Sequence, residues 1–125
     1  MKKILFVFTL VLAIATITLP LAFPAWATGV YQEYSAESYE NTKNLKRVLF
    51  FYANWCSGCR GTDQQLRSAT IPDDVIVLKI DYDSSVELRK KYGVPYQGTF
   101  VQIDSTGEKI SLWFGDANSL ADHVQ

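Results

Sequence analysis

The sequence predicts an α/β fold in three layers, with a central mixed four-stranded sheet flanked by helices. Three observations lead to this class. Two short apolar runs, 48–54 and 75–81, have the composition of strands that are buried on both faces. Polar segments with helix-capping residues separate the apolar runs. Two alternating segments split by a glycine-containing turn follow them, as in an antiparallel hairpin.

A helix and a strand are expected first. The polar, tyrosine-rich segment 31–47 has helix formers after Ser35, a candidate N-cap, and its helix should end near Lys46. The run "VLFFYAN" at 48–54 is short and rich in aromatic residues, which favours a buried central strand.

A second helix and a second strand should follow. The segment "CSGCRGTDQQLRS" at 56–68 turns polar, lacks proline and keeps Leu66 as its main apolar anchor, so we expect a helix that begins at the cysteines. The run "VIVLKID" at 75–81 is apolar and β-branched, which indicates a buried strand. Because a helix connects the two strands, they should be parallel.

The last third of the chain should contain a helix, a hairpin and a short final helix. Ser84 and Glu87 have the spacing of a capping box, and Gly93 is a natural helix terminator. The segments "TFVQID" and "EKISLWF" flank the turn "STG" and form the hairpin. The segment 116–125, "DANSLADHVQ", should form the final helix.

The first 27 residues have the pattern of a secretory signal peptide. Lys2 and Lys3 precede an uncharged apolar stretch that contains two prolines and ends in the small-residue motif "AWA". We therefore expect cleavage after Ala27 and a domain over 28–125, located in the periplasm or another extracytoplasmic compartment. The alternative is an uncleaved segment, in which residues 4–23 anchor the domain to the membrane.

Composition and charge exclude some functions. The chain is 48% hydrophobic and 14% aromatic, which is typical of a globular domain. Loss of Lys2 and Lys3 from the 12 basic residues leaves 10 of them against 13 acidic residues. Basic residues are also dispersed among acidic ones, so we expect no nucleic-acid binding.

The motif "NWCSGCR" contains the only two cysteines of the chain, Cys56 and Cys59. On the first turn of a helix, cysteines at this spacing can form a disulfide, and the helix N-terminus stabilises negative charge on the first sulfur. The thiolate is the form that attacks disulfides, so Cys56 is the candidate nucleophile and Cys59 the resolving thiol.

Two other interpretations of the cysteines stay open. A purely structural disulfide would close a very small ring and would stabilise the fold little. A zinc site needs further ligands, and His123 near the C-terminus is the only histidine available. We expect His123 to be an ordinary residue of the final helix.

The stretch "VLFFYANWCSGCR" resembles the active-site strand and helix of the thioredoxin superfamily, whose hallmark is Trp-Cys-x-x-Cys. The segments "VIVLKID", "LRKKYGV" and "TFVQIDSTGEKI" resemble the following elements of that fold, and the similarity covers most of 31–125. The resemblance implies a thioredoxin-like fold and a thiol–disulfide oxidoreductase.

The sequence departs from the superfamily pattern at three positions. Phe50 occupies the place of a buried acidic residue, and Val77 that of a nearby lysine. The count from the hairpin turn back to Thr99 places Gly98 where most members have a cis-proline, so Pro95 should not face the cysteines and its peptide bond should be trans.

The resemblance implies that Cys56 and Cys59 are catalytic and exchange disulfides with protein substrates, with an unidentified redox donor or acceptor protein as second partner. No metal and no organic cofactor is expected. The expected substrate-binding residues are Trp55, Ser57, Gly58, Gln97, Gly98 and Thr99. The alternative from another class is a binding or chaperone-like module that keeps the fold without turnover. The direction of electron flow stays open.

Overall fold

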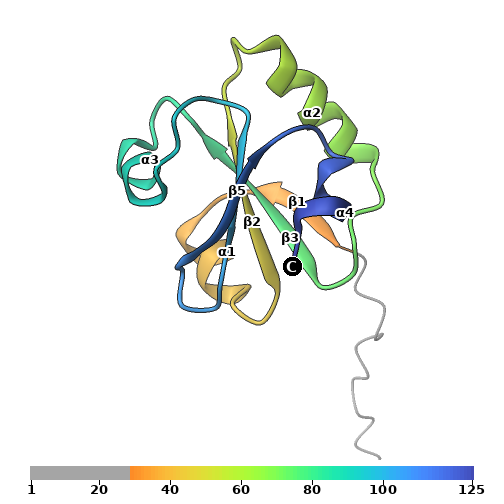
Figure 1. The fold of residues 1–125 in the computed structure, drawn as a ribbon, viewed down its shortest axis with the longest axis vertical. Coiled ribbons are helices and arrows are strands. Elements are labelled where there is room, and N and C mark those ends of the chain that lie inside the picture. The colour runs from red at the N-terminus through yellow and green to blue at the C-terminus, as the bar shows by residue number, and fades with distance from the viewer. Residues whose placement is uncertain (1–28) are drawn as a thin grey trace, which may run out of the picture.

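The computed structural model describes residues 29–125, which form one five-stranded mixed sheet with four helices around it (Figure 1). The strand order is β1-β3-β2-β4-β5. The elements in chain order are β1 (Val30–Glu33), α1 (Ala36–Asn41), β2 (Lys46–Tyr52), α2 (Ser57–Ser68), β3 (Val75–Asp81), α3 (Val86–Tyr92), β4 (Thr99–Ile103), β5 (Lys109–Phe114) and α4 (Ser119–His123). The predicted fold class, a mixed sheet flanked by helices, is confirmed, but the sheet has five strands and not the expected four, because β1 adds a strand at its edge.

The helices divide between the two faces of the sheet (Figure 1). One core contains Cys59 and Leu66 of α2 and Leu120 of α4, packed on alternate residues of the strands. The opposite core contains Tyr92 of α3, with Tyr39 of α1 packed against it. Strand β2 therefore contributes to both cores, and its residues 48–51 are fully buried.

The segment 31–47 does not contain the single expected helix from Ser35 to near Lys46, because it contains a strand before Ser35 and a helix that ends at Asn41. Strand β1 pairs in parallel with β3, with Tyr31 opposite Val77. Helix α1 does begin after the predicted N-cap, where the Ser35 hydroxyl accepts a hydrogen bond from the Ser38 amide at 2.9 Å. The strand was missed because a short, polar edge strand has almost no apolar pattern. Such a strand is stabilised by its pairing with a strand that is distant in the sequence.

The central strands are predicted correctly. Strands β2 and β3 run parallel, and β2 pairs antiparallel with β4, which forms the expected hairpin with β5. A β-branched and aromatic composition suits such central strands, because their side chains pack on both faces. The C-terminal end of β2 leads directly into the cysteine motif.

The capping box predicted at Ser84 is not formed. Helix α3 begins one residue later than expected, with Ser85 as an N-cap whose side chain makes no capping bond. The Ser84 amide instead donates to the Asp81 carboxylate at 2.9 Å. Gly93 does end the helix, in a left-handed conformation with φ of 66°.

The predicted signal peptide, 1–27, lies outside the described residues. Among the residues from 29 onward, none of the helices has both the length and the apolar character needed to span a bilayer.

Candidate active site

The two cysteines lie at the start of α2, as the sequence predicts. Cys56 is the N-cap, and its Sγ accepts a hydrogen bond from the Cys59 amide at 3.1 Å. An amide hydrogen bond and the N-terminus of a 12-residue helix both favour negative charge on the Cys56 sulfur. Both cysteines are free thiols, so the structure represents the reduced protein.

The two thiols have different surroundings. Cys56 is half-buried and lies between the exposed residues Trp55 and Ser57, whereas Cys59 is only 2% exposed. Burial, followed by the hydrogen bond with Cys56, raises the pKa of the Cys59 thiol to about 11. The geometry therefore presents Cys56 to a substrate and keeps Cys59 protonated behind it.

Aromatic side chains fill the core beneath Cys59. Phe50 is fully buried in the same core as Cys59 and stacks on Phe100, with ring centroids 4.7 Å apart. Phe100 stacks in turn on Trp113 at 5.5 Å. Position 50 thus contributes an aromatic ring where the superfamily has an acid, and it supplies no proton acceptor to Cys59.

Gly98 lies beside the thiols, in the register that the sequence predicts. A Cβ atom added to Gly98 would lie 3.7 Å from Cys59 Sγ. Its φ of 80° favours glycine, and its amide donates to the Phe51 carbonyl at 2.8 Å. The described residues contain no cis peptide bond, so Pro95 follows a trans bond as expected.

Thr99 has a different role from the predicted one. Its side chain is fully buried, and its hydroxyl donates to the Tyr96 carbonyl at 2.7 Å. It therefore fixes the loop before β4 and offers no side chain to a substrate. Gln97 and Gly98 in the same loop are half-buried and stay within reach of the surface.

Trp55 is held by an acidic residue that the sequence analysis did not identify. Its indole donates from Nε1 to the Asp83 carboxylate at 2.8 Å, while 58% of the residue stays exposed. Asp83 follows β3, which ends beside the end of β2 in the parallel pair. Only the sheet topology brings these two residues together.

A charged network lies under the next turn of α2, on the same face as Cys59. The Asp63 carboxylate accepts a hydrogen bond from the Tyr31 hydroxyl at 2.6 Å and pairs with Lys79 Nζ at 3.1 Å. Arg67 Nε reaches the same carboxylate at 3.0 Å, and Glu33 reaches Lys79 at 3.3 Å. The network joins α2 to both β1 and β3.

The network determines the protonation of its members. Burial raises the pKa of Asp63, but hydrogen bonds from Tyr31, Arg67 and Lys79 outweigh burial and lower it below the usual range. Burial lowers the pKa of Lys79, and its hydrogen bonds to Asp63 and Glu33 outweigh this and raise it. Asp63 is therefore a permanent anion at neutral pH and a weak base.

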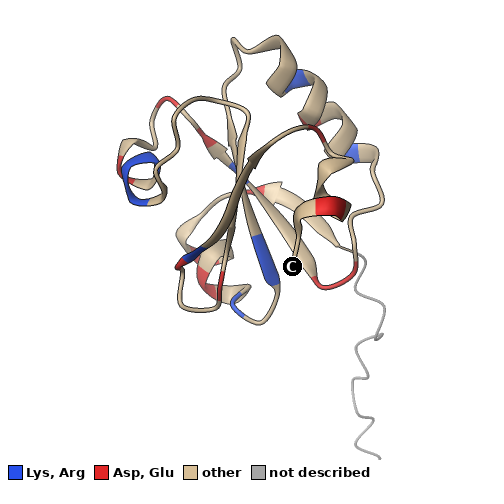
Figure 2. Ribbon diagram, viewed as in Figure 1, with Lys and Arg blue, Asp and Glu red and all other residues tan. Residues whose placement is uncertain are grey.

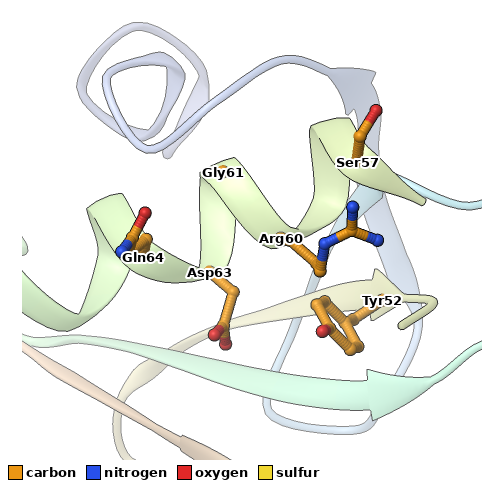
Figure 3. Close-up of a pocket in the computed structure, with 6 residues that line it drawn as sticks. All are labelled: Tyr52, Ser57, Arg60, Gly61, Asp63 and Gln64. Carbon is orange, nitrogen blue, oxygen red and sulfur yellow. The ribbon is translucent and has the colours of Figure 1, made fainter. Parts of the chain in front are cut away.

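An open cavity of about 540 Å³ lies beside this network. Figure 3 shows Arg60 and Asp63 projecting from α2 toward the strand that carries Tyr52, with Ser57 at the N-terminal end of the cavity. Arg60 itself donates to the Asn54 carbonyl at 2.7 Å. Two of the lining side chains, Arg60 and Asp63, thus already have hydrogen-bond partners.

Figure 2 shows basic and acidic positions interspersed along the part of the chain that the structure describes. Within 29–125, no three His, Cys, Asp or Glu side chains come close enough together to hold a metal ion.

A reduced Cys-x-x-Cys pair at the N-terminus of a helix, directly after a central strand, defines a thiol–disulfide exchange protein. The thioredoxin family model matches residues 30–124. Thioredoxin-1 of Drosophila yakuba is 41% identical over 75 residues, which cover 58% of this chain and 70% of that protein. Thioredoxin-1 of Caenorhabditis elegans is 32% identical over 69 residues, which cover 54% of this chain and 59% of that protein.

Solved structures agree with these matches. A mutant thioredoxin from Halobacterium salinarum superposes with a TM-score of 0.62 at 27% identity, covering 78% of this chain and 88% of that one. Schistosoma mansoni thioredoxin gives a TM-score of 0.61 at 25% identity, covering 78% of this chain and 93% of that one. The chain belongs to the thioredoxin family and is a thiol–disulfide oxidoreductase.

Proposed function

We propose that the protein is exported and exchanges disulfides with protein substrates, with Cys56 as the nucleophile and Cys59 as the resolving thiol. The observation that carries this assignment is the asymmetry of the pair. Cys56 Sγ caps α2 and accepts a hydrogen bond from the Cys59 amide, while the Cys59 side chain is buried behind it. Trp55, Ser57, Gly58, Gln97 and Gly98 are the residues around the pair that a substrate can contact.

The reaction proceeds in two exchanges. The Cys56 thiolate attacks one sulfur of the substrate disulfide, whose S–S bond breaks as a mixed disulfide forms and one substrate thiolate leaves. The Cys59 thiolate then attacks Cys56 Sγ, releases the second substrate thiolate and closes the Cys56–Cys59 disulfide. Two electrons pass from the protein to the substrate, and the protons of the two cysteines pass to the released thiolates or to solvent. A dithiol protein then reduces the Cys56–Cys59 disulfide by the same exchanges in reverse. In the opposite direction of electron flow, substrate thiols reduce that disulfide, and a disulfide acceptor protein forms it again.

The second exchange requires loss of the Cys59 proton. Phe50 and its stacked neighbours offer no acceptor, and Asp63 is a weak base that already receives several hydrogen bonds. We propose that water or the departing substrate thiolate accepts this proton. The second step should consequently be the more strongly pH-dependent one.

Trapping of the intermediate tests the roles of the two cysteines. The reduced protein is mixed with an oxidised protein substrate such as insulin, and the products are resolved without reductant. Cys56→Ser should show no exchange above background, whereas Cys59→Ser should accumulate a mixed disulfide through Cys56. Accumulation in Cys56→Ser instead would reverse the assignment. Binding of substrate without exchange by the wild type would favour the binding-module alternative.

Export is supported by the composition of the first 27 residues, with their basic start, apolar stretch and "AWA" motif. N-terminal sequencing of the exported protein should give Thr28 as the first residue. A full-length species that requires detergent for extraction would instead support the membrane-anchored alternative.

A further inference from the structure

One face of helix α2 is polar and exposed from the residue after Cys56 onward. Ser57, Arg60, Gly61 and Gln64 follow one another at i, i+3, i+4 and i+7, which places them on the same face of the helix. All of them are exposed, and all of them line the open cavity of about 540 Å³ (Figure 3). We call these residues the polar stripe.

Two glycines leave the first turns of α2 without side chains. Gly58 and Gly61 lie inside the helix, where glycine is less favourable than alanine. Neither has a positive φ, and a Cβ atom added to either would meet nothing within 4 Å in the part of the chain that the structure describes. Internal packing therefore does not explain these glycines, and they leave room for a polypeptide to approach the helix closely.

Arg60 is the cation of the polar stripe and is held close to Cys56. Its backbone amide donates to the Cys56 carbonyl at 3.1 Å, so it lies one helical turn, about 6 Å, along the helix axis from that residue. Its Nη1 donates to the carbonyl of Asn54, two residues before Cys56, at 2.7 Å. The Nε and Nη2 edge of the guanidinium thus stays available for a carboxylate, which can bind there with two hydrogen bonds.

The charge of Arg60 is not compensated within residues 29–125. None of the ion pairs of these residues includes Arg60. Asp63 lines the same cavity, but Lys79 Nζ at 3.1 Å and Arg67 Nε at 3.0 Å already compensate its charge. An anion at the thiol end of the cavity would therefore meet a cation that has no acidic partner.

We propose that the polar stripe binds polypeptide disulfides with an acidic side chain close to the reacting cysteine, and that Arg60 pairs with this carboxylate. A substrate cysteine joined to Cys56 lies within about one helical turn of Arg60, so a neighbouring Glu or Asp can reach the guanidinium. The substrate backbone then lies over the bare turn at Gly58 and Gly61. This proposal rests on the proposed function and specifies its substrate class.

The test compares four oxidised substrates. Two are short peptide disulfides that differ only in Glu or Gln beside the cysteine, the third is glutathione disulfide, and the fourth is the uncharged bis(2-hydroxyethyl) disulfide. The second-order rate of oxidation of the reduced protein is measured by acid quench and mass spectrometry. The proteins are the wild type, Arg60→Gln, Gly61→Gln and the control Lys90→Gln, which removes a cation of α3 whose side chain is 71% exposed.

The wild type and Lys90→Gln should react with the Glu peptide about fivefold faster than with the Gln peptide at low salt, the upper range for an exposed ion pair. Arg60→Gln should bring this ratio to about 1, and about 0.5 M salt should lower it strongly in the wild type. Any effect of Arg60 on the reactivity of the thiol cancels in the ratio, because both peptides react with Cys56.

Gly61→Gln tests the close approach of the substrate backbone. This variant should react several-fold more slowly with both peptides, relative to its rate with bis(2-hydroxyethyl) disulfide. Its Tm should be no lower than that of the wild type, because the added side chain enters open space and glycine is the weaker helix former. A selective loss of the peptide reactions would thus not result from unfolding.

Equal rates of the wild type with the two peptides, or an unchanged preference in Arg60→Gln, would overturn the proposal. Glutathione disulfide supplies carboxylates without a longer polypeptide. If its rate depends on Arg60 as that of the Glu peptide does, while Gly61→Gln slows neither peptide, the site recognises a small disulfide and the polypeptide assignment is overturned. If the wild type reacts with none of the substrates, it is the proposed exchange function that fails.

Discussion

Two successive turns of helix α2 rest on very different surfaces, because Cys59 and Asp63 lie one turn apart on the same face. Toward β4, Cys59 lies on an aromatic core that begins with Phe50 and Phe100. Toward β1 and β3, Asp63 lies in a network with Lys79 that fastens the helix to the sheet. The chain therefore has an acid and a lysine under its active-site helix, and Lys79 lies on β3 opposite Phe50 of β2. We infer that this pair fastens the helix to the sheet and that Cys59 exchanges its proton without it.

The largest effect is expected from removal of the charge at the centre of the network. Asp63→Ala leaves Lys79 and the Tyr31 hydroxyl without their half-buried partner, so the free energy of unfolding should fall by about 2 kcal/mol. Urea unfolding measures the change. The Cys56→Ser and Cys59→Ser trapping pattern should persist in this background.

A matched control for Asp63 is the exposed pair of Glu87 and Lys90, whose oxygen and nitrogen lie 3.3 Å apart with side chains 88% and 71% exposed. Glu87→Ala should change the free energy of unfolding by less than about 0.5 kcal/mol, because exposed pairs contribute little. Equal losses in the two variants would show that the network does not fasten α2.

A smaller effect is expected on the aromatic side. Phe50→Leu keeps an apolar residue but removes the stacking on Phe100, which should cost about 1 kcal/mol in unfolding free energy. Cys59 stays in an apolar environment, so its rate of attack on the mixed disulfide should stay within about twofold. A loss of that rate by an order of magnitude would mean that Phe50 does more than fill space beneath the thiol.

The smallest effect concerns pH. The pKa of Asp63 is lower in the folded protein than the ordinary value of 3.8, so its ionised form stabilises the fold. This contribution is fully present above the ordinary value and is lost as the pH falls through the lowered folded value. The difference in unfolding free energy between the wild type and Asp63→Asn should therefore be constant from pH 7 to about pH 5 and shrink in stronger acid. A difference that grows on acidification would contradict the assigned charge state.

The sequence alone predicts the parts of this molecule that local pattern controls. The apolar runs of β2 and β3 and the spacing of Cys56 and Cys59 identify the central strands and the thiol pair. The count from the hairpin turn places Gly98 correctly beside Cys59. These features depend on neighbours in the chain, or on one well-defined turn.

The missed features depend on pairing between distant segments. Strand β1 has little apolar character, and its place at the sheet edge follows from pairing with β3. The stacked pair of Tyr96 and Phe114 forms only because β4 and β5 align in the hairpin. The link between Asp63 and Lys79 likewise requires α2 to lie across the parallel strands.

Titration of Cys59 tests the central claim that the thiol is insulated from the charged network. Selective 13C labelling of the cysteine Cβ atoms allows each thiol of the reduced protein to be followed by NMR as the pH rises. We predict that Cys59 ionises near pH 11 in the wild type and at the same pH in Lys79→Met. Ionisation below the ordinary value of 9.0, or a shift of a full pH unit in Lys79→Met, would show that the network does reach the thiol.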